Sequence, residues 1–192
     1  MTIAERIMKN MITRTKERIK TRDITVIAFF VALTAICAQI AIPMPGGVPM
    51  SLQTWAVLFS GIFLGSKKGA LAILIYVLLG AIGIPVFANF GAGIGRILGP
   101  GGGFILSFPL MSYIAGLGLE VKAEKKSKII LLVALTTAII ANFLCGMVFF
   151  TFIMEVSFGV AFATVVLPFI PLAVIEIIVI LGISDKLRGL KI

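Results

Sequence analysis

Histidine is absent from the 192 residues of this sequence, and other groups that commonly carry chemistry are scarce. Its absence removes the commonest general acid–base residue and the commonest metal ligand from any candidate site. A serine protease within the membrane would lack the base for its serine. An aspartyl protease would need paired aspartates, whereas Asp23 and Asp185 stand at the ends of apolar segments. We therefore expect no catalytic residues and no enzymatic activity.

Cysteine is also scarce, with only two residues in the chain. Cys37 and Cys145 both lie within apolar runs, which favours a packing role over a disulfide or a metal site. The glycine-rich runs GAGIG and GPGGGF lack the Lys and Ser/Thr that complete a phosphate-binding loop. We therefore predict no metal, no cofactor and no ATP binding by this chain.

Charged residues make up only 13% of the sequence, against about a quarter in soluble domains. Hydrophobic residues make up 60%, and the mean hydropathy is +1.18. A chain of this length has room for about six apolar helices of roughly 20 residues each. These numbers predict an all-α integral membrane protein. Although the net charge is +9, the basic residues fall between apolar segments and do not indicate nucleic-acid binding.

Six apolar segments are predicted to span the membrane, at residues 24–42, 52–64, 70–82, 104–119, 129–154 and 165–183. The second and third are shorter than a simple crossing requires, so we expect them to be short, bent or completed by loop. Prolines and glycines at 43–49 end the first span, and the glycine-rich, apolar stretch 83–103 is expected to pack into the protein. The predicted organisation is a cytoplasmic, basic amphipathic segment at 1–23 and a six-helix domain at 24–192.

Lysine and arginine collect in alternate connections between these segments. All but one of the 17 lie in the N-terminal segment, the connections between spans 2 and 3 and spans 4 and 5, and the C-terminal tail. Because basic residues accumulate on the cytoplasmic side, this pattern predicts that both termini lie on the cytoplasmic side of a prokaryotic cell membrane. An odd number of spans would divide the basic clusters between the two sides.

Arg96 is the basic residue left on the outer side, within a glycine-rich loop. Glycines allow close backbone approach, so Arg96 is suited to pair with an anionic group such as a substrate carboxylate. A role as a lipid headgroup anchor is the alternative. Asn89, in the same loop, offers donors and an acceptor to a ligand, or caps a turn.

Glu176 is an ionisable residue well inside a predicted span, where such residues are costly and usually functional. Three roles are compatible with the sequence: accepting N–H groups from a substrate, pairing with Arg96, or carrying a proton. Gln53 at the outer end of span 2 and Tyr76 in span 3 are weaker polar candidates, and Tyr76 suits the core equally well.

Several motifs in residues 42–110 resemble the BioY family of biotin-specific substrate-binding subunits (S components) of energy-coupling factor (ECF) transporters. They are PMSLQT, LGSKKGA, GIPVFA and GPGGGFILSFP. The resemblance implies a six-helix membrane fold with outer loops that close over the vitamin. It also implies a transmembrane coupling protein and two ATPase subunits as partners. Ala28 and Ala32 form an AxxxA pair that resembles the family's docking motif, and small residues at this spacing allow close helix approach.

The sequence departs from the family pattern near the last span. Family members often carry an acidic residue followed three positions later by a lysine, where this chain has Ala173 and Glu176, and Gly101 stands where threonine is usual. These departures leave another small carboxylate, such as lipoate, as an alternative ligand. A self-sufficient proton-coupled transporter using Glu176, or an accessory scaffold without a ligand, are alternatives of other classes.

The leading hypothesis is capture of biotin from outside the cell. Arg96 would pair with the valerate carboxylate and Glu176 would accept the ureido N–H groups. Asn89 would lie at a polar end of the ligand, and Phe87, Phe90 and the loop glycines would line its apolar part.

Overall fold

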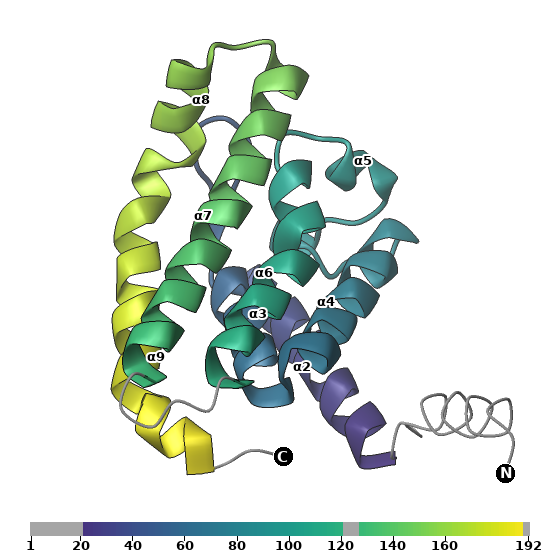
Figure 1. The fold of residues 1–192 in the computed structure, drawn as a ribbon. Helices are drawn as coiled ribbons and strands as arrows, with labels where there is room; N and C mark the ends of the chain where they lie inside the picture. Colours follow the sequence, from purple (N-terminus) through teal and green to yellow (C-terminus); the bar gives the residue numbers. More distant parts are fainter. Residues whose placement is uncertain (1–20, 121–126, 190–192) are drawn as a thin grey trace, which may run out of the picture.

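Helices make up most of the chain in the computed structural model, which describes residues 21–120 and 127–189 (Figure 1). The predicted basic segment at 1–23 lies outside the described residues except for its last three, which open the first described helix. The elements in chain order are α2 Thr21–Gln39, β1 Ala41–Ile42, β2 Met50–Ser51, α3 Gln53–Leu64, α4 Ser66–Ala81, η1 Ala88–Phe90, α5 Ile94–Ile97, α6 Gly102–Glu120, α7 Ser127–Met154, α8 Phe158–Val165, η2 Leu167–Phe169 and α9 Ile170–Gly189.

Four helical stretches in the described part are long and apolar enough to cross a membrane: α2, α6, residues Lys128–Met154 of α7, and the stretch Phe158–Ile183 that runs from α8 into α9. The prediction of a helical membrane protein is therefore confirmed. The helices α3 and α4 have 12 and 16 residues, so the two segments predicted to be short form short helices.

The first predicted span ends earlier than expected. Helix α2 ends at Gln39, and Ala41–Ile42 forms strand β1, which pairs antiparallel with Met50–Ser51 of β2. The chain reverses through Gly46 and Gly47, whose φ angles of +88° and +77° suit glycine. An apolar run that hydropathy assigns to one helix is thus divided between a helix and a hairpin.

The last predicted span, 165–183, is also divided, because its main helix α9 begins at Ile170. Residues 158–165 form the separate helix α8, which Ser157 caps by accepting a hydrogen bond from the Val160 N–H. Pro168 lies in the short helix η2 between α8 and α9, and Pro171 lies in the first turn of α9, where its missing N–H costs nothing.

Helix α6 is the most buried of the four long apolar stretches and contacts α3, α4 and α7. Glycines allow this packing: a Cβ added at Gly61 of α3 would lie 2.0 Å from the carbonyl oxygen of Ser112 in α6. The hydroxyls of Ser60 and Ser112 lie 2.8 Å apart across the same interface. Small residues and hydrogen bonds between helices are typical of membrane bundles, where lipid supplies little hydrophobic driving force for helix association.

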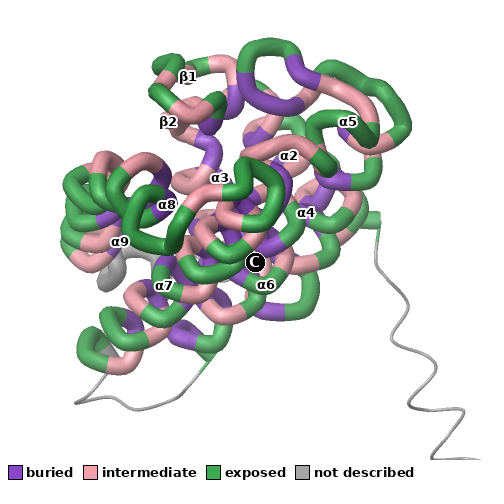
Figure 2. Tube along the Cα trace, turned by 90° about the horizontal axis from the view of Figure 1, so that it is seen from above, coloured by how far each residue is buried: buried purple, intermediate pink, exposed green. Residues whose placement is uncertain are grey.

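The two ends of the bundle differ in charge. One end of the bundle holds the start of α2, the α3–α4 junction, the starts of α4 and α7 and the end of α9. The other end holds α5 and the hairpin (Figures 1 and 2). Arg22, Lys67, Lys68 and Lys128 belong to first turns at the former end, and Arg96 belongs to α5. The segregation predicted from the sequence is therefore present among the described basic residues.

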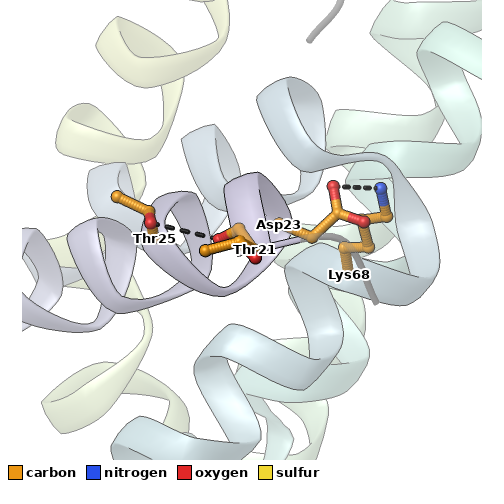
Figure 3. A network of polar contacts seen from close by, with 4 residues as sticks. All are labelled: Thr21, Asp23, Thr25 and Lys68. Carbon is orange, nitrogen blue, oxygen red and sulfur yellow. Dashed lines mark hydrogen bonds and ion pairs between the residues drawn. The ribbon is translucent and has the colours of Figure 1, made fainter. Parts of the chain in front are cut away.

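Two polar contacts hold this basic end together. Lys68 Nζ lies 2.7 Å from Asp23 Oδ1, which joins the first turns of α4 and α2 (Figure 3). Glu120 Oε1 accepts hydrogen bonds from the Ser66 N–H at 2.7 Å and from its hydroxyl at 2.9 Å. The carboxylate at the end of α6 therefore caps the start of α4, where helix N–H groups lack partners.

Candidate ligand-binding site

A cavity of about 200 Å³ lies toward the end of the bundle that carries Arg96. Its walls come from the 47–51 segment with β2, the start of α3, the 87–101 segment with α5, α6, α7, η2 and the start of α9. Figure 2 looks down on this end, with the hairpin and α5 nearest the top and much of α8 and α9 exposed to one side. Segments distant in the sequence therefore supply the lining.

The lining is mainly aromatic and aliphatic, with a few polar side chains. The aromatic members are Phe87, Phe104, Phe108, Phe143 and Phe169. The rings of Phe104 and Phe169 stack with centroids 6.4 Å apart. Apolar walls with a few placed polar groups are typical of sites for small organic molecules.

Arg96 lines this cavity and is exposed, so it lies at the open rim. Its side chain passes over Gly91, because a Cβ added there would lie 2.6 Å from Arg96 Nε. The described residues give Arg96 no ion-pair partner within 4 Å. A guanidinium at the rim of an apolar cavity is suited to hold a carboxylate.

Gln53 and Tyr76 occupy different positions relative to the cavity. Gln53 lines it and is only 4% exposed, and its Nε2 donates to the Tyr76 hydroxyl at 2.8 Å. Tyr76 lies behind the lining, donates to the Val86 carbonyl at 2.9 Å and packs edge-on against Phe87. Tyr76 therefore orients Gln53 and Phe87 and does not line the cavity itself.

Asn89 and Phe90 lie outside the cavity lining, and both are exposed. They form the centre of a tight turn, with φ angles of 56° and 54°. Gly91 N donates to the Ala88 carbonyl across this turn. Residues with positive φ at both central positions are typical of type I′ turns, in which asparagine suits the first and glycine the second. Phe90 stands where glycine is favoured, and this turn directs Phe87 rather than Phe90 into the cavity.

Glu176 lies in α9 and is 2% exposed. Its carboxylate accepts a hydrogen bond from the Thr54 hydroxyl. It lines a smaller cavity of about 20 Å³, which shares Thr54, Asn142 and three apolar residues with the main one. Among the described side chains no ion pair joins Glu176 to Arg96, so the pairing considered from the sequence does not occur in this structure.

Two polar residues that line both the main cavity and the smaller one were missed by the sequence analysis. Thr54 follows Gln53 at the start of α3, and Asn142 lies in the middle of α7, 2% exposed. Asn142 Nδ2 donates to the Phe104 carbonyl at 3.1 Å and to Ser107 Oγ at 2.7 Å, which ties α7 to α6. An amide in the middle of an apolar span is the signal that marks Asn142, since buried polar groups in membranes are costly and usually functional.

Ala28 and Ala32 are exposed on the outer side of α2. The opposite side of the helix is buried, through Ile27, Phe30, Thr34 and Ala38. The small-residue pair therefore lies away from the bundle, where another helix could pack closely.

Comparison with known proteins identifies the family. The family model of BioY matches residues 9–191. A probable biotin transporter BioY from Pyrococcus horikoshii is 41% identical over 170 residues, which are 88% of this chain and 98% of that protein. The biotin transporter BioY of Thermotoga maritima is 45% identical over 105 residues, 55% of this chain and 59% of its own. These relatives are named as transporters and not as enzymes.

A solved structure has the same fold. The crystal structure of the S-component for biotin from an ECF-type ABC transporter superposes with a TM-score of 0.76. The match covers 91% of this chain and 94% of the solved chain, at 24% sequence identity. The family model spans nearly the whole sequence and a relative is 41% identical along almost its full length. The chain therefore belongs to the BioY family.

Proposed function

We propose that this chain is the substrate-binding subunit of an ECF-type vitamin importer in the cytoplasmic membrane, and that it captures biotin from outside. The observation that carries the proposal is an apolar cavity with Arg96 at its rim, at the end of the bundle opposite Arg22, Lys67, Lys68 and Lys128. The family relatives named as biotin transporters support the ligand.

The membrane arrangement that we propose has six spans with both termini inside. The spans are α2, α3, α4, α6, α7 and the stretch from α8 through α9. Helix α3 is about 18 Å long at 1.5 Å per residue, which is shorter than a hydrocarbon core of about 30 Å. The hairpin that precedes α3 and the 82–101 segment that follows α4 would complete the outer half of the bundle. Their irregular backbone would be enclosed by protein, since such backbone is not tolerated in contact with lipid.

In the proposed complex the biotin carboxylate pairs with Arg96 at the rim, and the apolar part lies among the phenylalanines. The ureido end points toward Gln53 and Thr54, deeper in the cavity. Because the Thr54 hydroxyl donates to Glu176, its oxygen can still accept a hydrogen bond from a ligand N–H. Glu176 thus acts through Thr54 in this conformation. We place Asn89 and Phe90 outside the direct contacts, since neither lines the cavity.

Transport would require partners. We propose a coupling protein resembling those of ECF transporters, together with two ATPase subunits, because the chain carries no phosphate-binding loop of its own. The exposed Ala28 and Ala32 of α2 offer a face on which a helix of the coupling protein could pack.

Calorimetric titration of the purified, detergent-solubilised protein with biotin tests the proposal. We expect saturable binding, and we expect Arg96→Ala to weaken it by about tenfold or more, since hydrogen bonds to charged groups contribute about 1.5–3 kcal/mol. Biotinamide, which lacks the carboxylate, should bind wild type and Arg96→Ala with similar affinity. Folded wild-type protein that gives no binding would refute the proposal, and stronger binding of lipoate in a competition panel would replace the ligand.

A second candidate function is a self-sufficient proton-coupled transporter, because Glu176 is a buried ionisable residue. In liposomes without ATPase partners, wild-type protein should then take up biotin when a pH gradient is imposed, and Glu176→Gln should abolish the uptake. The S-component function predicts no such uptake by either variant.

A further inference from the structure

The side chain of Gln39 joins the end of α2 to the turn that borders the cavity. Its Nε2 donates to the Phe87 carbonyl at 3.2 Å and to the Ala35 carbonyl within α2 at 3.0 Å. Its Oε1 accepts a hydrogen bond from the Phe90 N–H at 2.8 Å. One amide therefore contacts the backbone on both sides of the Ala88–Asn89 step, some 50 residues away along the chain.

The turn that Gln39 holds is strained and depends on its surroundings. Asn89 and Phe90 both have positive φ, a conformation that phenylalanine rarely adopts. Phe87 and Gly91 exchange backbone hydrogen bonds of 3.0 and 3.1 Å that close the turn. Strained backbone of this kind persists when neighbouring contacts over-determine it, and Gln39 supplies two of those contacts.

Both ends of this turn carry residues that line the site. Phe87 lines the cavity directly, packed edge-on against Tyr76 with ring centroids 5.7 Å apart. Gly91 lies beneath the side chain of Arg96 at the rim. A change in the turn therefore displaces an apolar wall and the guanidinium together.

We propose that Gln39 is a positioning residue that holds the 87–91 turn in its ligand-retaining conformation, and thereby links ligand release to the position of α2. The inference rests on the proposed function. Helix α2 has a polar contact to the rest of the bundle near each end, the Asp23–Lys68 pair and the Gln39 amide. Movement of α2 away from the 87–91 turn breaks both Gln39 contacts and leaves the strained turn free to open.

Two measurements on full-length protein in detergent test this role: hydrogen exchange of the peptide covering 87–91, and the dissociation rate of biotin. Gln39→Met keeps the length of the side chain and removes both contacts. We expect exchange in this peptide and biotin dissociation each to rise by about tenfold, with exchange in α6 and α7 unchanged. Gln39→Glu keeps the acceptor for the Phe90 N–H and loses the donor, so both rates should fall between wild type and Gln39→Met. Ile40→Met, at the exposed neighbouring residue, should match wild type.

The outcomes separate the two proposals. If wild type does not bind biotin, the proposed function fails, and the exchange data still report on the Gln39 contacts. If wild type binds biotin and Gln39→Met changes neither rate by more than about twofold, the inference is overturned. Faster exchange with unchanged dissociation would also overturn it, because Gln39 would then support the turn without influencing the ligand.

Discussion

The hydroxyl of Thr54 in α3 donates a hydrogen bond to the carboxylate of Glu176 in α9, at the boundary between the main cavity and the smaller one. The two residues are 122 positions apart in the sequence, and helices α3 and α9 have few other contacts. This bond therefore serves two purposes. It ties α9 to the bundle core, and it sets the orientation of a polar group that faces the cavity.

Replacing Thr54 by valine preserves the shape of the side chain and removes the donor. Glu176 is then left buried without the Thr54 hydrogen bond, which we expect to cost about 1–3 kcal/mol of stability. Thermal unfolding in detergent should show the loss as a lower melting temperature, and biotin affinity should fall as well. Combining Thr54→Val with Glu176→Met, which removes the acceptor and keeps the length of the side chain, provides the control. Since the two side chains interact, the double variant should be more stable than the sum of single effects predicts, by about 1 kcal/mol. Strictly additive effects would mean that the bond contributes nothing.

Gly91→Ala should weaken biotin binding without unfolding the protein. The backbone of Gly91, with φ −64° and ψ 146°, accepts any residue, so only space opposes the added methyl group. That methyl would lie 2.6 Å from Arg96 Nε, which belongs to a flexible side chain that can move aside at little cost. It would also lie 3.1 Å from the Ala88 carbonyl oxygen, which must shift by a few tenths of an ångström. We expect affinity to fall by about tenfold in titration calorimetry, with the melting temperature nearly unchanged.

Two controls accompany this change. Gly159→Ala in α8 adds a methyl group into open space and should alter neither quantity. In an Arg96→Ala background, Gly91→Ala should have no further effect on affinity. A full loss in that background would show that Gly91 acts by another route.

Phe90→Gly tests whether Phe90 contributes conformation or contact. A non-glycine residue with positive φ costs about 1–3 kcal/mol, and glycine removes that strain while adding about 0.5–1 kcal/mol of chain entropy cost. We expect Phe90→Gly to unfold at a higher temperature than Phe90→Ala, which keeps the strain. Both should bind biotin within about threefold of wild type, because Phe90 does not line the cavity. If both variants lose affinity equally and strongly, Phe90 contacts the ligand, as expected from the sequence.

Replacing Ala28 and Ala32 together with tryptophan should leave biotin binding by the isolated protein nearly intact, because both side chains lie on the exposed side of α2. Bulk on this side should prevent close helix packing and abolish co-purification with the coupling protein and uptake in cells. Ala163→Trp, on the exposed side of α8, should assemble normally. Normal assembly and transport by the double variant would mean that α2 is not the docking face.

Much of the helical framework could be predicted from the sequence. Hydropathy is a local property, so the apolar runs of α3, α6 and α7 were located within a few residues of their observed ends. Arg96 and Glu176 were recognisable for the same reason, since a charge among apolar residues or glycines is visible without knowledge of the neighbours. The segment ends were harder. Ala41–Ile42 is as apolar as the helical residues before it, and only its pairing with Met50–Ser51 makes it a strand.

The membership of the site was decided by tertiary structure. Asn142 and Thr54 reach one cavity because α3, α6 and α7 pack through small residues that fix which sides meet, and a sequence read one segment at a time does not specify those contacts. Phe87 and Phe90 were both expected to line the cavity, and only Phe87 does, for a similar reason: a turn with two positive φ angles, held by Gln39 from another helix, directs one ring inward and leaves the other exposed. The sequence by itself determined a helical membrane protein with a charged rim residue and a buried acid, because solvent preference is encoded residue by residue. Only the packed structure decided which side chains surround the cavity, because that depends on contacts between residues far apart in the chain.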